Sequence, residues 1–410
     1  MKSLFLTLLS FFCIVFSYAQ NLQVSTIVNN INASGGVTIG PDGNIYASDY
    51  GPGLGAPMPT KVYTVAYGTW DVSIFADGFP GASGSCFDAA GNFYQSSPFG
   101  KKISKIDSNN NVDLDWATEG FTLPIGIQQG HDGNFYVCDC TQNQIIQVTP
   151  DGNTSVFADS PDFACPNGLT IDPEGILYAC NFTDGKVLKI TPEAEVTVLT
   201  QIPQLLGGPN PIGAGHLTWK NDFLFVTAIG RGEVYKVDMQ GNQELIAGVA
   251  FGFSNNDGPA LQATFSKPNG IAASITGDTL FLNVSDPTWP SAPQALHPAH
   301  LRMITGVCSL PDVDCPLLTS TEEAKPSNQH LFSISPNPSR TSVTVTFDQN
   351  RIQVPFQVQL IDSLGQVLKT TKIEHHLQPI KFSLEDVPSG IFWVQVNTKT
   401  ETYSAQLIVE

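Results

Sequence analysis

The sequence predicts an all-β protein, a six-bladed β-propeller followed by a small β-sandwich. A glycine-anchored strand–turn–strand pattern recurs along most of the chain, and residues 330–410 change to a different strand pattern. The composition agrees, because 36 of the 410 residues are Gly, 29 are Pro and only 14% are charged. Many turn formers and few charges are typical of proteins built from short strands.

The repeat is clearest at residues 166–181. Leu169 and Ile171 alternate with polar residues, which is the period-two pattern of a half-buried strand. Pro173-Glu-Gly175 supplies a turn, and a second apolar strand follows it. Six copies of this unit lie 42 to 55 residues apart, and their anchor residues are Gly36, Gly84, Gly126, Gly168, Gly215 and Gly270.

Each copy continues into further strands, such as Lys186–Ile190 as a third and Thr154–Ala158 as a fourth. Four strands in such a repeat make one propeller blade. The sixth copy ends after its third strand, Leu301–Val307, and Leu22–Val28 resembles a fourth. We therefore expect the N-terminal segment to complete the last blade, which would hide the exposed edges of an open ring.

The predicted domain organisation has four parts. Residues 1–19 read as a Sec signal peptide, with Lys2, an apolar run and a Ser17-Tyr-Ala19 cleavage site. The propeller is expected over 20–307, a linker over 308–329 and the sandwich over 330–410. No other apolar run has transmembrane length, so we expect a protein that is soluble or attached to a surface by other means.

The formal net charge of −18 argues against nucleic acid and anionic lipid as partners. It fits a generic acidic extracellular protein, and it also attracts cations. Export permits disulfides. Cys308–Cys315 is the first expected pair and Cys140–Cys165 the second, while Cys138-x-Cys140 fits a buried thiol or a disulfide better than a metal site.

Residues just before the inner strands of a propeller converge on one mouth of its channel. Asn167, His216 and Asn269 are therefore candidate ligand-binding residues, and His216 is also the candidate acid or base because imidazole titrates near neutral pH. The alternative is that the two Asn side chains only bond to local backbone.

A second set of candidates follows the second strands. Asp49, Asp139 and Asn181 each lie 13 residues after an anchor, where their oxygens would bind a cation or a sugar, or simply cap turns. The pair in His297-Pro-Ala-His300 has suggestive spacing, but its Pro and loop context favour a solvated loop, and His375-His376 lies in the C-terminal part. We find no nucleophile elbow, phosphate loop or His-Glu-x-x-His motif.

The C-terminal part resembles the sorting domain of type IX secretion cargo. The matching features are Ser335-Pro-Asn-Pro338, Leu360–Gly365, Leu384–Gly390 before an aromatic strand, and a terminal strand. The resemblance implies Sec export, then type IX secretion machinery as a partner, and a protein that is released or attached to the outer surface.

The ring resembles NHL-repeat propellers, most clearly at Asp257–Ala272, and is similar to gluconolactonase or senescence-marker propellers. In the latter enzymes a divalent metal such as calcium sits in the channel, held by an entrance Asn, a Glu and an Asp. By that resemblance Asn167 and Asn269 are the candidate metal ligands. The entrances of the first blade, Asn32–Gly36, and of the fifth, Gly213–His216, lack the Glu and the Asp.

Two classes of function follow from these features. The first is a secreted or surface propeller that binds a small molecule, a glycan or a protein at its mouth. The alternative is a metal-dependent, gluconolactonase-like hydrolase or a lyase acting in the channel.

Overall fold

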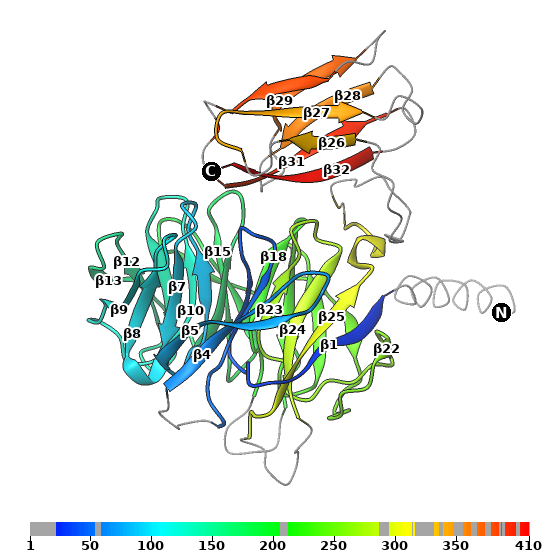
Figure 1. Ribbon diagram of the computed structural model, residues 1–410. Helices are drawn as coiled ribbons and strands as arrows, with labels where there is room; N and C mark the ends of the chain where they lie inside the picture. The colour runs from blue at the N-terminus through cyan, green and yellow to red at the C-terminus, as the bar shows by residue number, and fades with distance from the viewer. Residues whose placement is uncertain are drawn as a thin grey trace, which may run out of the picture. The chain divides into compact units, whose positions relative to one another are not determined.

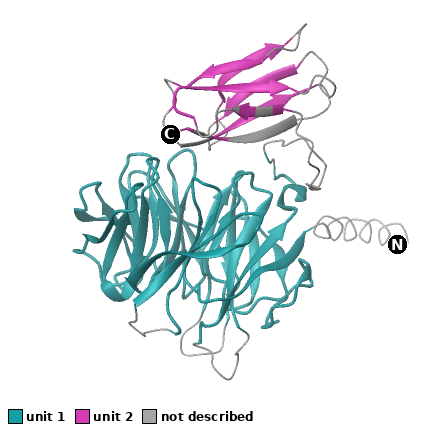
Figure 2. Cartoon of the chain, in the orientation of Figure 1, with its two compact units in different colours: residues 1–315 teal, residues 316–410 magenta. Residues whose placement is uncertain are grey.

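A computed structural model describes residues 22–53, 59–205, 212–286, 295–313, 315, 332–335, 339–347, 356–361, 367–373, 379–384, 387, 390–398 and 402–409. The chain divides into two compact units, Met1–Cys315 and Pro316–Glu410 (Figure 2). The predicted signal peptide, His375-His376 and residues 316–329 of the predicted linker lie outside the described residues.

The larger unit is a six-bladed β-propeller, as predicted, and its blades stand around a central axis (Figure 1). Five blades each contain four consecutive antiparallel strands. The first two blades comprise β2 (Val37–Ile39), β3 (Ile45–Ser48), β4 (Pro59–Val65) and β5 (Val72–Pro80), then β6 (Ser85–Phe87), β7 (Phe93–Ser97), β8 (Lys102–Ile106) and β9 (Val112–Ala117). The next three comprise β10 (Pro124–Gln129), β11 (Phe135–Asp139), β12 (Gln144–Val148) and β13 (Thr154–Asp159), then β14 (Pro166–Ile171), β15 (Leu177–Asn181), β16 (Lys186–Ile190) and β17 (Val196–Gln201), then β18 (Leu217–Lys220), β19 (Phe223–Ala228), β20 (Glu233–Val237) and β21 (Gln243–Gly248).

The sixth blade closes the ring with the N-terminal strand, which confirms that prediction. Its strands are β23 (Ile271–Ala273), β24 (Thr279–Ser285), β25 (Ala299–Thr305), β1 (Gln23–Ile31) and β22 (Gly258–Pro259). β1 pairs antiparallel with β25, with Gln23 opposite Thr305. The short β22 adds a fifth strand that the sequence pattern did not predict, and it covers the outer edge of β1.

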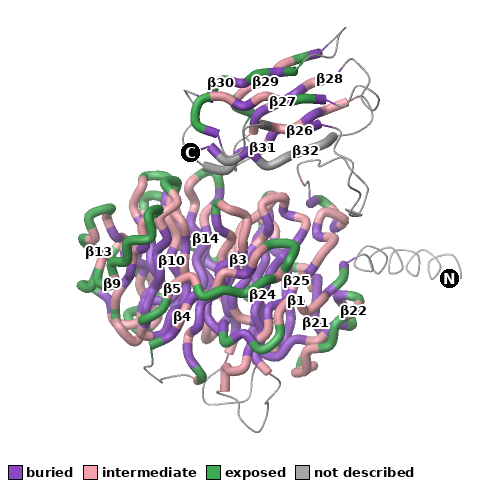
Figure 3. Tube along the Cα trace, in the orientation of Figure 1, coloured by how far each residue is buried: buried purple, intermediate pink, exposed green. Residues whose placement is uncertain are grey.

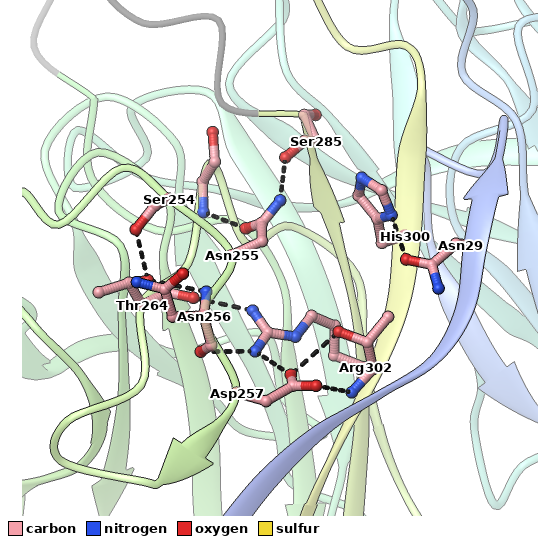
Figure 4. Close-up of polar contacts among 11 residues, drawn as sticks. Asn29, Ser254, Asn255, Asn256, Asp257, Thr264, Ser285, His300 and Arg302 are labelled. Atoms are coloured by element: carbon pink, nitrogen blue, oxygen red, sulfur yellow. Dashed lines mark hydrogen bonds and ion pairs between the residues drawn. The ribbon is translucent and has the colours of Figure 1, made fainter.

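A buried arginine ties this closure to the preceding loop (Figure 4). Arg302, on β25, is fully buried and donates to Thr264 O at 2.8 Å and to Asn256 O at 2.9 Å. It also pairs with Asp257 at 2.7 Å, and Asp257 accepts two 3.0 Å hydrogen bonds from Thr26 of β1. One ion pair therefore joins the closing strand, β25 and the loop before the sixth blade.

The anchor glycines are required because the entrance strands approach each other closely. A Cβ added at Gly168 would lie 2.7 Å from His216 Cα, and one at Gly36 would lie 2.8 Å from Ser83 O. Hydrogen bonds cross the same contacts, since Gly36 N donates to Ser83 O and Gly84 N to Ile125 O, both at 2.9 Å. The repeat therefore reflects backbone packing around the axis.

The fifth blade differs from our prediction at its anchor. His216, not Gly215, occupies the anchor position, because His216 N donates to Asn269 O at 3.1 Å in the pattern of the glycines. The first-to-second-strand turn of this blade is one residue shorter than expected, with Lys220 directly opposite Phe223, and this shifts the register by one. An imidazole thus stands where the other five blades carry glycine.

A belt of side-chain hydrogen bonds joins each blade to the next, and it explains two of the free thiols. Each donor side chain lies on the second strand of its blade, near the axis. It bonds to a backbone carbonyl just before or at the first strand of the following blade, and for the first blade Gln95 relays this bond. The bonds run from Ser48 through Gln95 to Gly84 O, from Ser96 to Ile125 O, from Cys138 to Gly168 O, from Cys180 to Gly215 O, from Thr227 to Asn269 O, and from Asn283 to Ala33 O and Gly35 O.

Buried apolar residues fill the layers between adjacent blades. The inner strands are buried almost throughout, whereas the outer strands carry the exposed positions (Figure 3). The short 3-10 turn η3 (Val307–Ser309) and the segment after it also belong to this unit, since Leu310 and Val313 are buried in the same cluster as Leu280. Part of the segment expected as a linker therefore contributes to the propeller.

Both expected disulfides are confirmed. Cys308–Cys315 closes the segment that follows the last blade, and Cys140–Cys165 joins the third and fourth blades. Cys86, Cys138 and Cys180 are buried free thiols. Burial raises the pKa of each, that of Cys180 to about 12, so these thiols stay protonated.

The smaller unit is a β-sandwich of two sheets, with strand orders β26-β27-β30 and β29-β28-β31-β32. Its strands are β26 (Phe332–Ser335), β27 (Ser342–Phe347), β28 (Phe356–Ile361), β29 (Val367–Ile373), β30 (Ile380–Ser383), β31 (Gly390–Asn397) and β32 (Thr402–Val409). Val343, Val358 and Val394 are fully buried members of one cluster that draws on both sheets. The alternating pattern of these strands thus places alternate side chains in the core.

Candidate ligand cavity

The propeller has a cavity of about 390 Å³ at one mouth of its channel. Its lining side chains come from two kinds of position, which are the entrances to the first strands and the ends of the second strands. The lining residues are Ser34, Tyr50, Ser83, Phe99, Leu123, Ile125, Cys140, Cys165, Asn167, Phe182, Leu205, Ile212, His216, Ile229, Gly230, Phe253, Lys267, Asn269 and Leu296. The cavity is therefore mainly apolar, with a few polar groups.

Three of the candidate residues, Asn167, His216 and Asn269, line this one cavity. Asn167 Nδ2 donates to Gly215 O at 2.5 Å, and Asn269 Nδ2 donates to Ser34 O at 2.8 Å. The amide groups thus tie their own blades to the next ones, and do not bond to local backbone as the alternative expected. Both side chains nevertheless border the cavity.

His216 is the polar residue whose bonding is incomplete. Its side chain is 8% exposed, and its Nε2 atom is buried without a hydrogen-bond partner among the described residues. Burial lowers the pKa of the imidazole to about 4, so it is neutral at neutral pH. Leaving such a group unpaired is costly, and a ligand that bonds to it recovers that energy.

Part of the apolar wall comes from residues just after the second strands. Tyr50 follows β3, Phe99 lies in the 3-10 turn η2 (Pro98–Gly100) after β7, and Phe182 directly follows β15. The Tyr50 and Phe99 rings meet edge to face, with centroids 5.1 Å apart. The Cys140–Cys165 disulfide continues this wall between the third and fourth blades.

The second set of candidates, Asp49, Asp139 and Asn181, is not among the described residues that line the cavity. Asp139 is fully buried and accepts from Thr122 N at 2.6 Å and Leu123 N at 3.0 Å, which fixes the loop that enters the third blade. Asn181 is also fully buried, and its Nδ2 donates to Asp162 O and to Asp184 Oδ1. The neighbouring residues Cys140 and Phe182 line the cavity instead, because successive side chains of an extended chain point to opposite sides.

The interpretation of His297-Pro-Ala-His300 as a solvated loop was wrong. The side chain of His297 is 16% exposed, and its Nε2 lies 2.8 Å from Asp49 Oδ1 and 3.4 Å from Ser34 Oγ. His300 is 13% exposed and contacts Asp286 at 2.6 Å. Polar partners supplied by distant segments bury both rings, and sequence spacing does not show such partners.

Ser34, His297 and Asp49 do not form a nucleophilic triad. The same ring nitrogen faces both the hydroxyl and the carboxylate. A triad needs one nitrogen for the serine and the other for the carboxylate. These contacts instead attach the segment after residue 294 to the first blade, where Leu296 N also donates to Pro52 O at 3.0 Å.

Family models match two regions of the chain. Residues 94–209 match the SMP-30/gluconolactonase/LRE-like region, and residues 333–410 match the secretion system C-terminal sorting domain. The chain carries a gluconolactonase-like propeller region and a type IX sorting domain. A comparison with curated proteins found no significant match.

Solved structures show the same propeller fold at low sequence identity. A protein of unknown function from Bacteroides thetaiotaomicron is 14% identical, with a TM-score of 0.54 over 69% of this chain and 76% of its own. A gluconolactonase from Xanthomonas campestris is 15% identical, with a TM-score of 0.51 over 70% of this chain and 90% of its own. At these identities the likeness concerns the fold.

The sorting domain indicates secretion or attachment to the outer surface. Among the residues that the structure describes, no helix is long and apolar enough to cross a membrane.

The described lining of this cavity does not fit the calcium-type metal that a gluconolactonase-like propeller region implies. A hard cation prefers several oxygen ligands that include carboxylates. No Asp or Glu is among the described lining residues, and Lys267 places a cationic side chain there. The described residues also contain no group of three or more His, Cys, Asp or Glu side chains arranged to hold a metal. Asn167 and Asn269 alone supply too few oxygens.

Proposed function

We propose that this secreted propeller binds a small, largely apolar molecule at its channel mouth. The observation that carries the proposal concerns His216, which lines the mainly apolar cavity. Its buried Nε2 atom has no hydrogen-bond partner among the described residues. Ligand sites commonly combine an apolar wall with a few polar groups that fix orientation. The size also suits the proposal, because a cavity of roughly 150 Å³ already holds benzene, and this one has about 390 Å³.

Calorimetric titration of the full chain with 2-naphthol and with naphthalene tests the proposal. The two probes share a fused ring and differ in one hydroxyl. We expect 2-naphthol to bind, and His216→Leu to weaken it about 5- to 10-fold, the equivalent of about 1 kcal/mol for one hydrogen bond. The affinity for naphthalene should stay the same or rise.

His131→Leu is the matched control, because His131 is exposed in the turn between β10 and β11 and is not a lining residue. This variant should bind both probes as the wild type does. Failure of both probes to bind the wild type would refute the proposal.

A second candidate is a channel enzyme that uses His216 as acid or base, and the same unpartnered nitrogen favours it. A general base must lie within reach of the proton that it takes. We rank binding first, because an imidazole with a pKa of about 4 is a weak base at neutral pH. Turnover of glucono-1,5-lactone that His216→Leu abolishes and a chelator leaves intact would favour the enzyme.

A further inference from the structure

Several polar groups of the cavity wall gather around one peptide unit, which joins Gly215 to His216. Asn167 Nδ2 donates to Gly215 O at 2.5 Å, and His216 N donates to Asn269 O at 3.1 Å. Asn269 Oδ1 lies against the same unit, since a Cβ added at Gly215 would come within 3.0 Å of it. Asn167, His216 and Asn269 all line the cavity, so they form one polar corner in a mainly apolar wall.

Backbone carbonyl groups fix the orientation of the two amide side chains in this corner. Nδ2 of Asn167 faces Gly215 O, and Nδ2 of Asn269 faces Ser34 O at 2.8 Å. A carbonyl oxygen only accepts hydrogen bonds, so it selects the NH2 end of an amide. Both residues therefore spend their donors on the protein and keep Oδ1 as an acceptor.

Both Oδ1 atoms remain open to the cavity. Among the described residues, no donor bonds to Asn167 Oδ1 or to Asn269 Oδ1. Neither oxygen is one of the enclosed side-chain atoms that lack a partner. An oxygen that is neither bonded nor enclosed borders free space, and the space that both residues line is the cavity.

Asn283 illustrates an amide of this ring whose role is structural. Its Nδ2 donates to Ala33 O and Gly35 O, and its Oδ1 accepts from Gly270 N at 2.8 Å. It is not among the described residues that line the cavity. An asparagine that only joins blades is thus bonded at both ends of its amide, whereas the two in the polar corner are bonded at one end.

The charges of the lining favour a neutral donor over a cation. No Asp or Glu is among the described residues that line the cavity, and Lys267 is one of them. A cationic head group would lose its hydration there without gaining a counter-charge. A hydroxyl or an amide N–H needs only an acceptor, and the polar corner offers two amide oxygens.

We propose that the ligand is a neutral, largely apolar molecule whose head group carries at least two hydrogen-bond donors, which bond to Asn167 Oδ1 and Asn269 Oδ1. This inference rests on the proposed binding function and specifies the head group of its ligand. A diol, a primary amide and a urea are the simplest head groups of this kind. The apolar body packs against the remaining wall, which includes Phe99 and Phe182.

Calorimetric titration of the full chain at pH 7 tests this inference with naphthalene-2,3-diol and naphthalene-2,7-diol, each beside its monomethyl ether. The ether keeps the ring and one hydroxyl but replaces the second donor by an acceptor. The two diols differ in the spacing of their hydroxyls. We expect at least one diol to bind the wild type about 5- to 10-fold more tightly than its ether, because it makes one further hydrogen bond.

The double variant Asn167→Leu/Asn269→Leu removes both acceptors and keeps side chains of similar size. It should bind the preferred diol and its ether equally tightly. Asn283→Leu is the matched control, because it also removes amide bonds between blades but changes no described lining residue. This variant should keep the wild-type preference for the diol.

Three results would overturn the inference. Equal binding of each diol and its ether to the wild type would do so without any variant, and so would tighter binding of the cation 2-naphthylmethylammonium than of either diol. A double variant that keeps the preference would show that the second hydroxyl bonds elsewhere. Binding of 2-naphthol without any preference for a diol would leave the proposed function standing, whereas failure of every naphthalene probe would remove both.

Discussion

Replacing His216 by Leu should change how the stability of the propeller depends on pH. The folded protein keeps this imidazole neutral with a pKa of about 4, against an ordinary value of 6.5. Between these two values the unfolded chain binds a proton that the folded chain does not. The wild type is therefore fully stabilised above about pH 6.5 and loses stability as the pH falls toward 4.

The magnitude follows from the size of the pKa shift. A fall from 6.5 to about 4 corresponds to about 3 kcal/mol in total, at about 1.4 kcal/mol for each pKa unit. Between pH 7 and pH 5 the part that is lost is about 2 kcal/mol. His216→Leu has no group to titrate at this position. The difference in free energy of unfolding between His216→Leu and the wild type should therefore shift in favour of His216→Leu by about 2 kcal/mol from pH 7 to pH 5.

Urea unfolding of both proteins at pH 7, 6 and 5 measures the difference directly. Carboxylates common to both proteins cancel in the comparison. His131→Leu controls for the loss of a histidine from an exposed site. Parallel stability curves for wild type and His216→Leu over this range would show that the imidazole is solvated or paired, and would refute the reasoning about the cavity.

Two further predictions concern the ring itself. Arg302→Leu should lower the free energy of unfolding by about 3 kcal/mol, because it removes a fully buried guanidinium that pairs with the half-exposed Asp257 and donates to two carbonyl groups. Lys102→Met, which breaks a pair with the exposed Asp115, should cost less than about 1 kcal/mol in the same urea experiment. Equal losses would contradict the closure by Arg302. Gly168→Ala should lower the melting temperature more than Gly91→Ala. At Gly168 the added Cβ meets backbone of the fifth blade, whereas at Gly91 it meets no atom and the cost is only that of the left-handed φ of 79°. The reverse order would show that the blades do not touch at Gly168.

The ring was predictable because its signals are local and repeated. Period-two alternation recurs in six units, five of them with a glycine at the anchor position, and Leu22–Val28 has the pattern of the missing strand. The fifth anchor was misassigned by one residue because Gly215 imitates the motif, while the shorter turn before Phe223 moves His216 into its place. A register shift of one residue reverses which side chain faces the axis.

The cavity was predictable only in part. Entrance residues such as Asn167 follow from their fixed distance to the anchors. Phe99 and Lys267 lie outside the strands, where no period-two pattern indicates the direction of a side chain. The partners of His297 come from the other end of the propeller sequence, and only the closed ring brings them together.

Closure by the first strand also has a consequence for the order of events during export. β1 precedes every other strand of the ring, yet its main partner is the last strand, β25. In a chain that emerges from its N-terminus first, the edge of β1 that pairs with β25 therefore stays unpaired until Ala299–Thr305 has emerged. Contacts between such distant segments form slowly, and an unpaired strand attracts other chains. The β1–β25 pairing in the sixth blade is thus the last part of the propeller to form. A chaperone that shields β1 would have its largest effect before this pairing.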